Sequence, residues 1–245
     1  MADSGMMNPS IIFEIDDQAA YIILNRPEKH NAINRELLAG LYDSIERVGK
    51  DDAIKVAVIT GMGKSFCSGI DLDTALSEST TDPTGQGREL PDLFAAVKKP
   101  LIGAINGYTI TGGLELALHC DFLIASERAF FTDSHARLNI HPGWGVTQLL
   151  QQAIGQRRAR QMSFSCEAVS ATRALEWGLV NEVVPHELLM PRAGQIARSI
   201  CNANPSILSK MKALIRCREK MTYHEAFVRE RESFRMYIKN ASKER

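Results

Sequence analysis

Short apolar runs separated by amphipathic segments dominate the first half of the chain. The runs 11–15 and 19–25 are rich in apolar and β-branched residues and are split by a turn-forming DDQ, so they predict two strands. The continuous apolar runs at 55–61 and 101–107 are typical of buried strands with both faces covered. Apolar residues at helical spacing over 36–50 predict a helix before the third strand.

The alternation of strand and helix continues to about residue 130 and then gives way to helices. Segments 90–100 and 112–120 have helical spacing, the first ended by Pro100, and 121–126 is typical of a strand. The later helical segments cover 146–154, 157–165 and 170–178, with one strand inside 177–185 and three longer helical segments after it. This order predicts an α/β core of stacked right-handed βαβ units, followed by a helical C-terminal third.

The composition is that of an ordinary soluble globular protein, with 44% hydrophobic and 24% charged residues. A length of 245 residues is enough for one large domain or two small ones. The 29 Lys and Arg residues equal the 29 Asp and Glu residues, so no global field attracts nucleic acid or an anionic membrane, and neither is expected as a partner. No apolar run reaches the ~18 residues that indicate a membrane span.

The cysteines and the N-terminal segment indicate the cellular compartment, and two polar segments are predicted to be mobile. The five cysteines are scattered and form no C-x-x-C pair, so we expect reduced thiols and neither a disulfide framework nor a zinc site. Residues 1–10 are polar and lack the features of a secretory signal, which predicts a disordered lead and a cytoplasmic protein. The Ser-, Thr-, Gly- and Pro-rich stretch 76–89 predicts a mobile loop.

Two glycine patterns that bind phosphates are absent. GMGKS at 61–65 lacks a glycine five residues before Gly63, where Val58 stands, so it is not a phosphate loop. No G-x-G-x-x-G opens a helix, so a dinucleotide cofactor is not expected either.

Two other glycine-containing segments each follow a buried strand. They are FCSGID at 66–71 and NGYTITGGLEL at 106–116, in which Gly112 and Gly113 stand where a helix begins. Glycine allows close approach to the backbone, and the first N–H groups of a helix point outward. Two strand ends that each offer one N–H group could hold a developing oxyanion between them. The glycines would serve tight turns equally well, so these segments alone leave both interpretations open.

Five segments together give the chain a resemblance to the enoyl-CoA hydratase/isomerase family, also called the crotonase superfamily. They keep the family's order over nearly the whole length: NRPEKHNAIN (25–34), VAVITGMGKSFCSGIDL (56–72), KKPLIGAINGYTITGGLELALHCDFLIAS (98–126), HPGWGVTQLL (141–150) and SATRALEWGLVNEVVP (170–185). The resemblance implies an α/β fold with a crotonase-like ββα spiral core over 11–190. It also implies a helical C-terminal trimerisation region over 191–245.

The resemblance further implies an acyl-CoA thioester as the substrate and a homotrimer or a dimer of trimers as the assembly. CoA is part of the substrate, so no separate cofactor and no metal are expected. Most members continue through one more helix beyond the position that matches Arg245, where this chain stops. The cover over CoA, the packing of subunits and a C-terminal targeting signal therefore stay open.

The site residues that the resemblance implies fall in the glycine segments. Ile70, after the glycine of S-G-x-D, and Gly112, in the middle of the glycine cluster, match the two residues whose N–H groups form the oxyanion hole. The groove for CoA would be lined around Lys29, Ser68, Gly69, Asp71 and Leu72. Cys67, beside this segment, is expected to be a small packed residue.

Hydratases of this family typically use two glutamates, and this chain keeps only one of them. Glu115 matches the first, on the helix after the glycine cluster, whereas His135 stands where the second is expected. Asp133 is a further catalytic candidate, because residues i and i+2 of a strand share one face and Asp133 would then orient the imidazole or reach the substrate itself. Arg137 is expected to form an ion pair at the surface or a trimer contact, and Trp144 to pack or to line the acyl pocket.

Three functions fit these residues. The first is an enoyl-CoA hydratase that adds water to a trans-2-enoyl-CoA, with Glu115 as acid and base. The second is a Δ3-Δ2 enoyl-CoA isomerase, for which one base suffices. The third is a non-catalytic acyl-CoA-binding protein, which the missing second glutamate favours. Acyl chain length and pathway are not encoded in these motifs.

Overall fold

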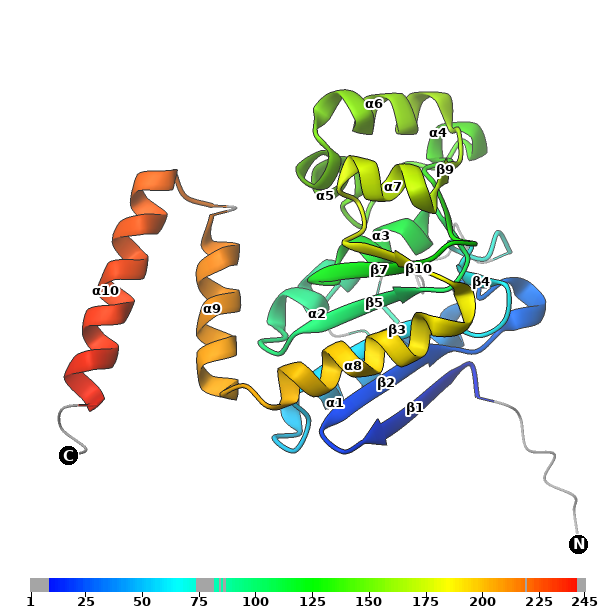
Figure 1. Ribbon diagram of the computed structural model, residues 1–245. Coiled ribbons are helices and arrows are strands. Elements are labelled where there is room, and N and C mark those ends of the chain that lie inside the picture. Colours follow the sequence, from blue (N-terminus) through cyan, green and yellow to red (C-terminus); the bar gives the residue numbers. More distant parts are fainter. Residues whose placement is uncertain (1–8, 74–81, 84, 86, 219, 242–245) are drawn as a thin grey trace, which may run out of the picture. The chain divides into compact units, whose positions relative to one another are not determined.

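The computed structural model describes residues 9–73, 82, 83, 85, 87–218 and 220–241 (Figure 1). The predicted lead at 1–10 and the predicted loop at 76–89 therefore fall largely outside the described residues. Two compact units divide the chain, Met1–Asn202 and Ala203–Arg245. The first contains both sheets, and the second consists of two helices.

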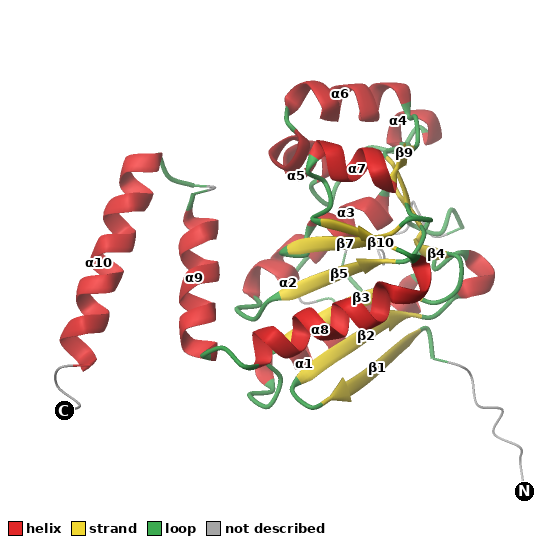
Figure 2. Cartoon of the chain, viewed as in Figure 1, coloured by secondary structure: helices red, strands yellow, loops and turns green. Residues whose placement is uncertain are grey.

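A six-stranded sheet forms the frame of the first unit (Figure 2). Its order is β1 (Ile11–Asp16), β2 (Ala19–Leu24), β3 (Val56–Gly61), β5 (Leu101–Ile105), β7 (Phe122–Ser126) and β10 (Glu182–Val184). β1 pairs antiparallel with β2, and every other pairing is parallel. β3 and β5 are buried at every position, as the continuous apolar runs predict.

Helices cover both faces of this sheet. On one face lies α8 (Leu189–Cys201), which packs Leu189 and Ala193 against strand residues such as Val58 (Figure 1). On the other face lie α1 (Arg35–Lys50), α2 (Leu90–Ala96) and α3 (Gly112–Leu118). The side chain of Asn34 caps α1 by accepting from the Leu37 N–H group, so the helix begins at Arg35, one residue before the predicted start.

A second, four-stranded sheet was not predicted from the sequence. Its order is β4 (Ser65–Cys67), β6 (Tyr108–Ile110), β8 (Phe130–Thr132) and β9 (Val169–Ser170). The first three of these strands run parallel, and β9 is antiparallel to β8. Each of β4, β6 and β8 follows a strand of the large sheet after a short turn. Glycine is required at one of these turns, because a Cβ at Gly107 would lie 1.9 Å from the Lys64 carbonyl oxygen.

The segment after β8 differs from the expected strand. β8 ends at Thr132, and His135 begins a short helix, α4 (His135–Leu138). Asp133 and His135 are therefore not neighbours on one face of a strand, and their contact arises at a strand-to-helix turn. Within the described chain, the Arg137 guanidinium donates to the Cys166 carbonyl (2.9 Å) and has no acidic partner, so the predicted ion pair with a trimer neighbour stays a prediction.

Three further helices complete the first unit. They are α5 (Val146–Ile154), α6 (Gln156–Ser165) and α7 (Ala171–Trp177). α5 and α6 form a helical hairpin joined at Gly155, which has φ +81°. Short 3-10 helices, η1 (Pro27–Lys29) and η3 (His186–Leu188), lie in the connections.

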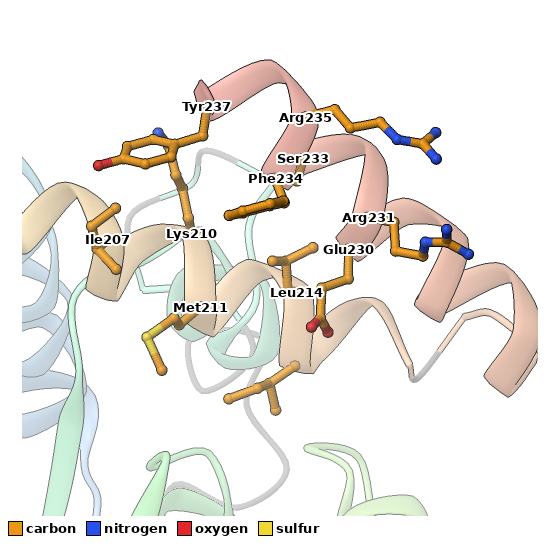
Figure 3. A pocket seen from close by; sticks show the side chains of 11 residues that line it. Ile207, Lys210, Met211, Leu214, Glu230, Arg231, Ser233, Phe234, Arg235 and Tyr237 are labelled. Atoms are coloured by element: carbon orange, nitrogen blue, oxygen red, sulfur yellow. The ribbon is translucent and has the colours of Figure 1, made fainter. Parts of the chain in front are cut away.

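The second unit contains α9 (Pro205–Cys217) and α10 (Tyr223–Ala241). A pocket of about 990 Å³ lies between these two helices, and its lining includes the apolar side chains of Ile207, Met211, Leu214 and Phe234 (Figure 3). α9 buries none of its residues within the described part of the chain. No described helix is both long and apolar enough to cross a membrane.

Candidate active site

The candidate site lies at the carboxyl edge of the small sheet. β4, β6 and β8 are parallel neighbours, so the segments that follow them leave the sheet at the same edge. Those segments carry Ile70, Gly112 and His135, three of the residues singled out in the sequence. The carboxyl edge of parallel strands is where α/β proteins most often bind ligands.

The backbones of Ile70 and Gly112 lie against each other. A Cβ added at Gly112 would lie 3.3 Å from the Ile70 nitrogen and 3.4 Å from the Gly69 Cα. Gly69 has φ +99°, a conformation that suits glycine and turns the chain after β4. Among the described residues, neither the Ile70 N–H nor the Gly112 N–H donates to a protein acceptor. Two unused donors therefore stand side by side, as an oxyanion hole requires.

Thr111, directly before Gly112, has a strained backbone. Its φ of 52° is a left-handed value that β-branched residues rarely adopt. Its N–H group donates to the Thr132 carbonyl (2.9 Å), and its hydroxyl bonds to the hydroxyl of Ser134 and accepts from the Ser134 N–H (3.2 Å). These bonds tie the end of β6 to the end of β8 and hold the backbone that presents Gly112.

The backbones of Gly113 and Cys67 pack closely against each other next to the site. A Cβ at Gly113 would lie 2.1 Å from the Cys67 carbonyl oxygen, which leaves no space for a side chain. Burial raises the pKa of the Cys67 thiol to about 12, so the thiol stays protonated at neutral pH. Cys67 is therefore the small packed residue that the sequence predicts.

Glu115 is buried, with 2% of its surface exposed. One carboxyl oxygen, Oε1, accepts from the backbone N–H groups of Trp144 (2.9 Å) and Val146 (3.1 Å) at the start of α5. Burial raises the pKa of Glu115, although the Val146 N–H, His135 and the Trp144 N–H oppose that change. A carboxyl group whose pKa is raised in this way is a stronger base than a free carboxylate and is suited to proton transfer. Trp144 thus contributes its backbone to the site.

His135 lies between Glu115 and Asp133. Its Nε2 is 3.6 Å from the Glu115 Oε2, and its Nδ1 is 2.7 Å from the Asp133 Oδ1. The exposed fractions of His135 and Asp133 are 7% and 3%. Burial alone would raise the pKa of Asp133, but hydrogen bonds from His135 and Ser163 together lower it, so Asp133 is ionised at neutral pH.

Ser163, on α6, is a site residue that sequence reasoning missed. Its hydroxyl donates to the second oxygen of Asp133, Oδ2, over 2.6 Å. No motif marks this serine, and it is 30 residues distant from Asp133 along the chain. Only the packing of α6 beside α4 brings the two together.

The residues expected around CoA also lie close together. The Ser68 N–H donates to the His30 carbonyl (3.0 Å), next to Lys29 at the end of η1, and the Ser68 hydroxyl donates to the Lys29 carbonyl (3.5 Å). The Asp71 carboxylate accepts from the Arg26 guanidinium at 3.2 Å, a partner not anticipated from the sequence. Leu72 is 67% exposed.

The chemistry that this edge offers is polarisation of a carbonyl oxygen combined with proton transfer. Two free N–H groups can accept negative charge, and a buried carboxyl–imidazole pair can move a proton. Within the described residues, no group of three or more His, Cys, Asp and Glu side chains is placed to hold a metal ion.

The sequence is similar to those of known proteins. The sequence model described as enoyl-CoA hydratase/isomerase matches residues 14–245. The chain is 36% identical over 232 residues to the "Probable enoyl-CoA hydratase 1, peroxisomal" of Arabidopsis thaliana, covering 92% of this chain and 85% of that protein. It is 35% identical to the "Crotonyl-CoA hydratase" of Syntrophomonas wolfei, covering 85% of this chain and 82% of that protein.

The fold is similarly matched by solved structures. The enoyl-CoA hydratase subunit I of Geobacillus kaustophilus superposes with a TM-score of 0.83 at 30% identity, covering 94% of this chain and 90% of that one. Such a score over almost the whole chain confirms the predicted α/β fold with its crotonase-like core.

Proposed function

The chain belongs to the enoyl-CoA hydratase/isomerase family, and on this premise we propose that it adds water across the double bond of a trans-2-enoyl-CoA thioester. The observation that carries the proposal is the pair of free N–H groups at Ile70 and Gly112, on the same sheet edge as the buried Glu115–His135 pair. Polarisation of a thioester and proton transfer are the two operations that hydration needs.

The oxyanion hole activates the substrate. The thioester oxygen binds between the N–H groups of Ile70 and Gly112. When water attacks C3, electrons shift toward that oxygen, and the two N–H groups stabilise the charge that develops there. Loss of one such donor typically costs ~3–4 kcal/mol of barrier. Backbone atoms supply the donors, so the side chain at position 70 is free to vary.

Glu115 and His135 handle the protons. The water oxygen bonds to C3 and a proton must reach C2, so the proton lost by water is matched by one delivered to carbon. Glu115 accepts a proton from water and returns one to C2. His135 exchanges a proton with Glu115 through Nε2 and positions the water, and Asp133 orients the imidazole. The raised pKa of Glu115 supports this role, because burial makes its carboxylate a stronger base toward water.

The proposal also covers the groove for CoA, the assembly of subunits and the cellular compartment. Lys29, Ser68, Gly69, Asp71 and Leu72 line the groove for CoA, and the proximity of Ser68 to the Lys29 carbonyl supports this grouping. The reaction requires no separate cofactor. The chain forms a homotrimer or a dimer of trimers through the helical C-terminal region and acts in the cytoplasm.

One observation favours a second candidate, a Δ3-Δ2 enoyl-CoA isomerase. Glu115 faces an imidazole instead of a second carboxylate, and one base is enough to move a proton between the α and γ carbons. The family description covers both activities.

The test measures both reactions with the full-length chain. Loss of enoyl absorbance on crotonyl-CoA and a longer trans-2-enoyl-CoA reports hydration, and conversion of a 3-enoyl-CoA reports isomerisation. We expect hydration by the wild type and its loss in Glu115→Gln. Glu176→Gln, which changes an exposed glutamate on α7, is the matched control. Isomerisation without hydration would replace the first candidate by the second, and CoA binding without either reaction would reject both.

A further inference from the structure

The helical hairpin α5–α6 and the residues at its start contact Glu115 directly and His135 through Asp133. The N–H groups of Trp144 and Val146, at the start of α5, fix one oxygen of Glu115. The Ser163 hydroxyl, on α6, bonds to Asp133, which in turn bonds to His135. The hairpin is thus the element that the two proton-carrying side chains have in common.

His135 and Ser163 each bond to a different oxygen of the Asp133 carboxylate. Oδ1 lies 2.7 Å from the His135 Nδ1 and 3.3 Å from the His135 N, while Oδ2 accepts from the Ser163 hydroxyl at 2.6 Å. Asp133 is 3% exposed, so water has little access to it. With both oxygens bonded, the carboxylate is held in one plane and against rotation.

We propose that Ser163 is a positioning residue that locks the Asp133 carboxylate and thereby holds His135 in the tautomer with a proton on Nδ1 and a free Nε2 facing Glu115. An ionised carboxylate oxygen only accepts hydrogen bonds, so the imidazole nitrogen bonded to it must carry the proton. The Nε2 lone pair is then directed to the side of Glu115. The effect on turnover rests on the proposed function, whereas the effect on the tautomer does not.

Two further observations support this role. The Ser163 hydrogen bond is among the causes that lower the pKa of Asp133, after the opposing effect of burial and after the bond from His135. A second bond, from the Arg137 guanidinium to the Cys166 carbonyl (2.9 Å), ties α4 to the end of α6. Asp133 and Arg137 thus both attach the segment 133–138 to α6 and its end. Of these described bonds, the one from Ser163 reaches a side chain of the proposed proton pathway.

The experiment compares Ser163→Ala with Ser163→Thr and with Ser165→Ala. Threonine retains the hydroxyl, and a cavity of about 230 Å³ lined by Val146, Ser163 and Phe164 offers space for its methyl group. Ser165 lies on the same helix, but its hydroxyl donates to the Gln161 carbonyl and not to Asp133. It is therefore the matched control for loss of a serine hydroxyl.

The first readout is the ¹⁵N spectrum of the imidazoles in the full-length protein, with His135 assigned by its absence in His135→Ala. We expect the Nδ1–H tautomer in the wild type, Ser163→Thr and Ser165→Ala, and a mixture of tautomers in Ser163→Ala. The second readout is hydration kinetics, in which Ser163→Ala should lower kcat about tenfold with KM nearly unchanged, and Ser163→Thr should recover most of it.

Two outcomes would overturn the inference. One is an unchanged His135 tautomer in Ser163→Ala. The other is a Ser163→Ala protein that melts earlier but retains wild-type kcat below its melting range, which would make the serine merely structural. A wild type that shows no hydration would reject the proposed function, and the ¹⁵N spectra would still decide the inference.

Discussion

The Nε2 atom of His135 lies 3.6 Å from the Oε2 atom of Glu115, and both side chains are buried. A slight rearrangement of either side chain would bring these two atoms within hydrogen-bond distance for proton exchange. The family resemblance predicts that two-glutamate hydratases have their second carboxylate at the position of His135. An imidazole never carries the negative charge with which a second carboxylate would repel Glu115.

The first prediction concerns His135 itself. His135→Ala should lower kcat for crotonyl-CoA hydration by about 10²-fold, because general acid–base groups typically contribute 10²–10⁴-fold. KM should change little, since the oxyanion hole and the CoA groove are untouched. Steady-state kinetics by enoyl absorbance provide the measurement, and circular dichroism checks folding. A kcat within twofold of the wild type would show that Glu115 works alone.

Asp133→Asn tests the orientation of the imidazole. The amide keeps the size of the carboxylate but has an NH₂ group that can donate to Nδ1, so it permits the opposite tautomer with the proton on Nε2. We expect kcat to fall at least tenfold while the protein stays folded. If Asp133→Asn leaves kcat intact, Asp133 has no part in proton transfer.

Gly112→Ala and Gly113→Ala form a matched pair with opposite expected results. At Gly112 the added Cβ would lie 3.3 Å from the Ile70 nitrogen, so it fits with a small shift but intrudes between the two N–H donors. We expect kcat/KM to fall about 10²–10³-fold, as for loss of an oxyanion donor, with a small loss of stability. At Gly113 the Cβ would lie 2.1 Å from the Cys67 carbonyl oxygen.

Gly113→Ala should therefore destabilise the fold by more than ~3 kcal/mol, because rigid backbone has to move. Urea unfolding and kinetics on both variants separate the two effects. Equal losses of stability in the two variants would contradict the assignment of Gly112 to the oxyanion hole and Gly113 to packing.

Glu115 should also make stability depend on pH. Its pKa is raised from the value of 4.5 for a free side chain, so the stability it contributes is complete below about pH 4.5 and is lost as pH rises through the folded-state pKa. Glu115→Gln is always neutral, and its amide oxygen can accept both N–H groups of α5. The variant should therefore gain stability relative to the wild type as pH rises, by no more than about 1.4 kcal/mol per pH unit.

Urea unfolding at several values between pH 5 and pH 8 measures this difference, with Glu176→Gln as the exposed control. The free energy of unfolding of Glu115→Gln minus that of the wild type should rise with pH. If this difference stays constant or falls, Glu115 does not have a raised pKa.

The large sheet and its helices were predictable from the sequence, whereas the small sheet was not. Runs such as 55–61 and 101–107 are long enough for their hydrophobicity to indicate a strand. β4, β6 and β8 have three residues each, too few for any periodicity to be visible. Their pairing is what brings Ile70 and Gly112 together. The glycine segments suggested such a contact but fitted tight turns equally well, and the family resemblance was needed to assign it.

The residues proposed to transfer protons could likewise be predicted only in part from the sequence. The sequence identified Glu115, His135 and Asp133, but it predicted a strand where a strand end, a turn and the helix α4 stand. Ser163 carries no signal of its own, because a serine on an amphipathic helix is ordinary and its partner lies in a distant segment. Contacts of this kind depend on how helices pack, and local pattern does not encode that packing.

The three site segments leave the edge of the small sheet from neighbouring strands, and the hydrogen bonds of Thr111 connect two of them. The N–H groups of Ile70 and Gly112 belong to the backbone, whereas the residue at position 135 acts through its side chain. A substitution of His135 therefore exchanges the group proposed to transfer protons without removing either N–H donor. Activation of a carbonyl depends on the course of the chain, and proton chemistry depends on the identity of side chains, so the same scaffold can support more than one reaction.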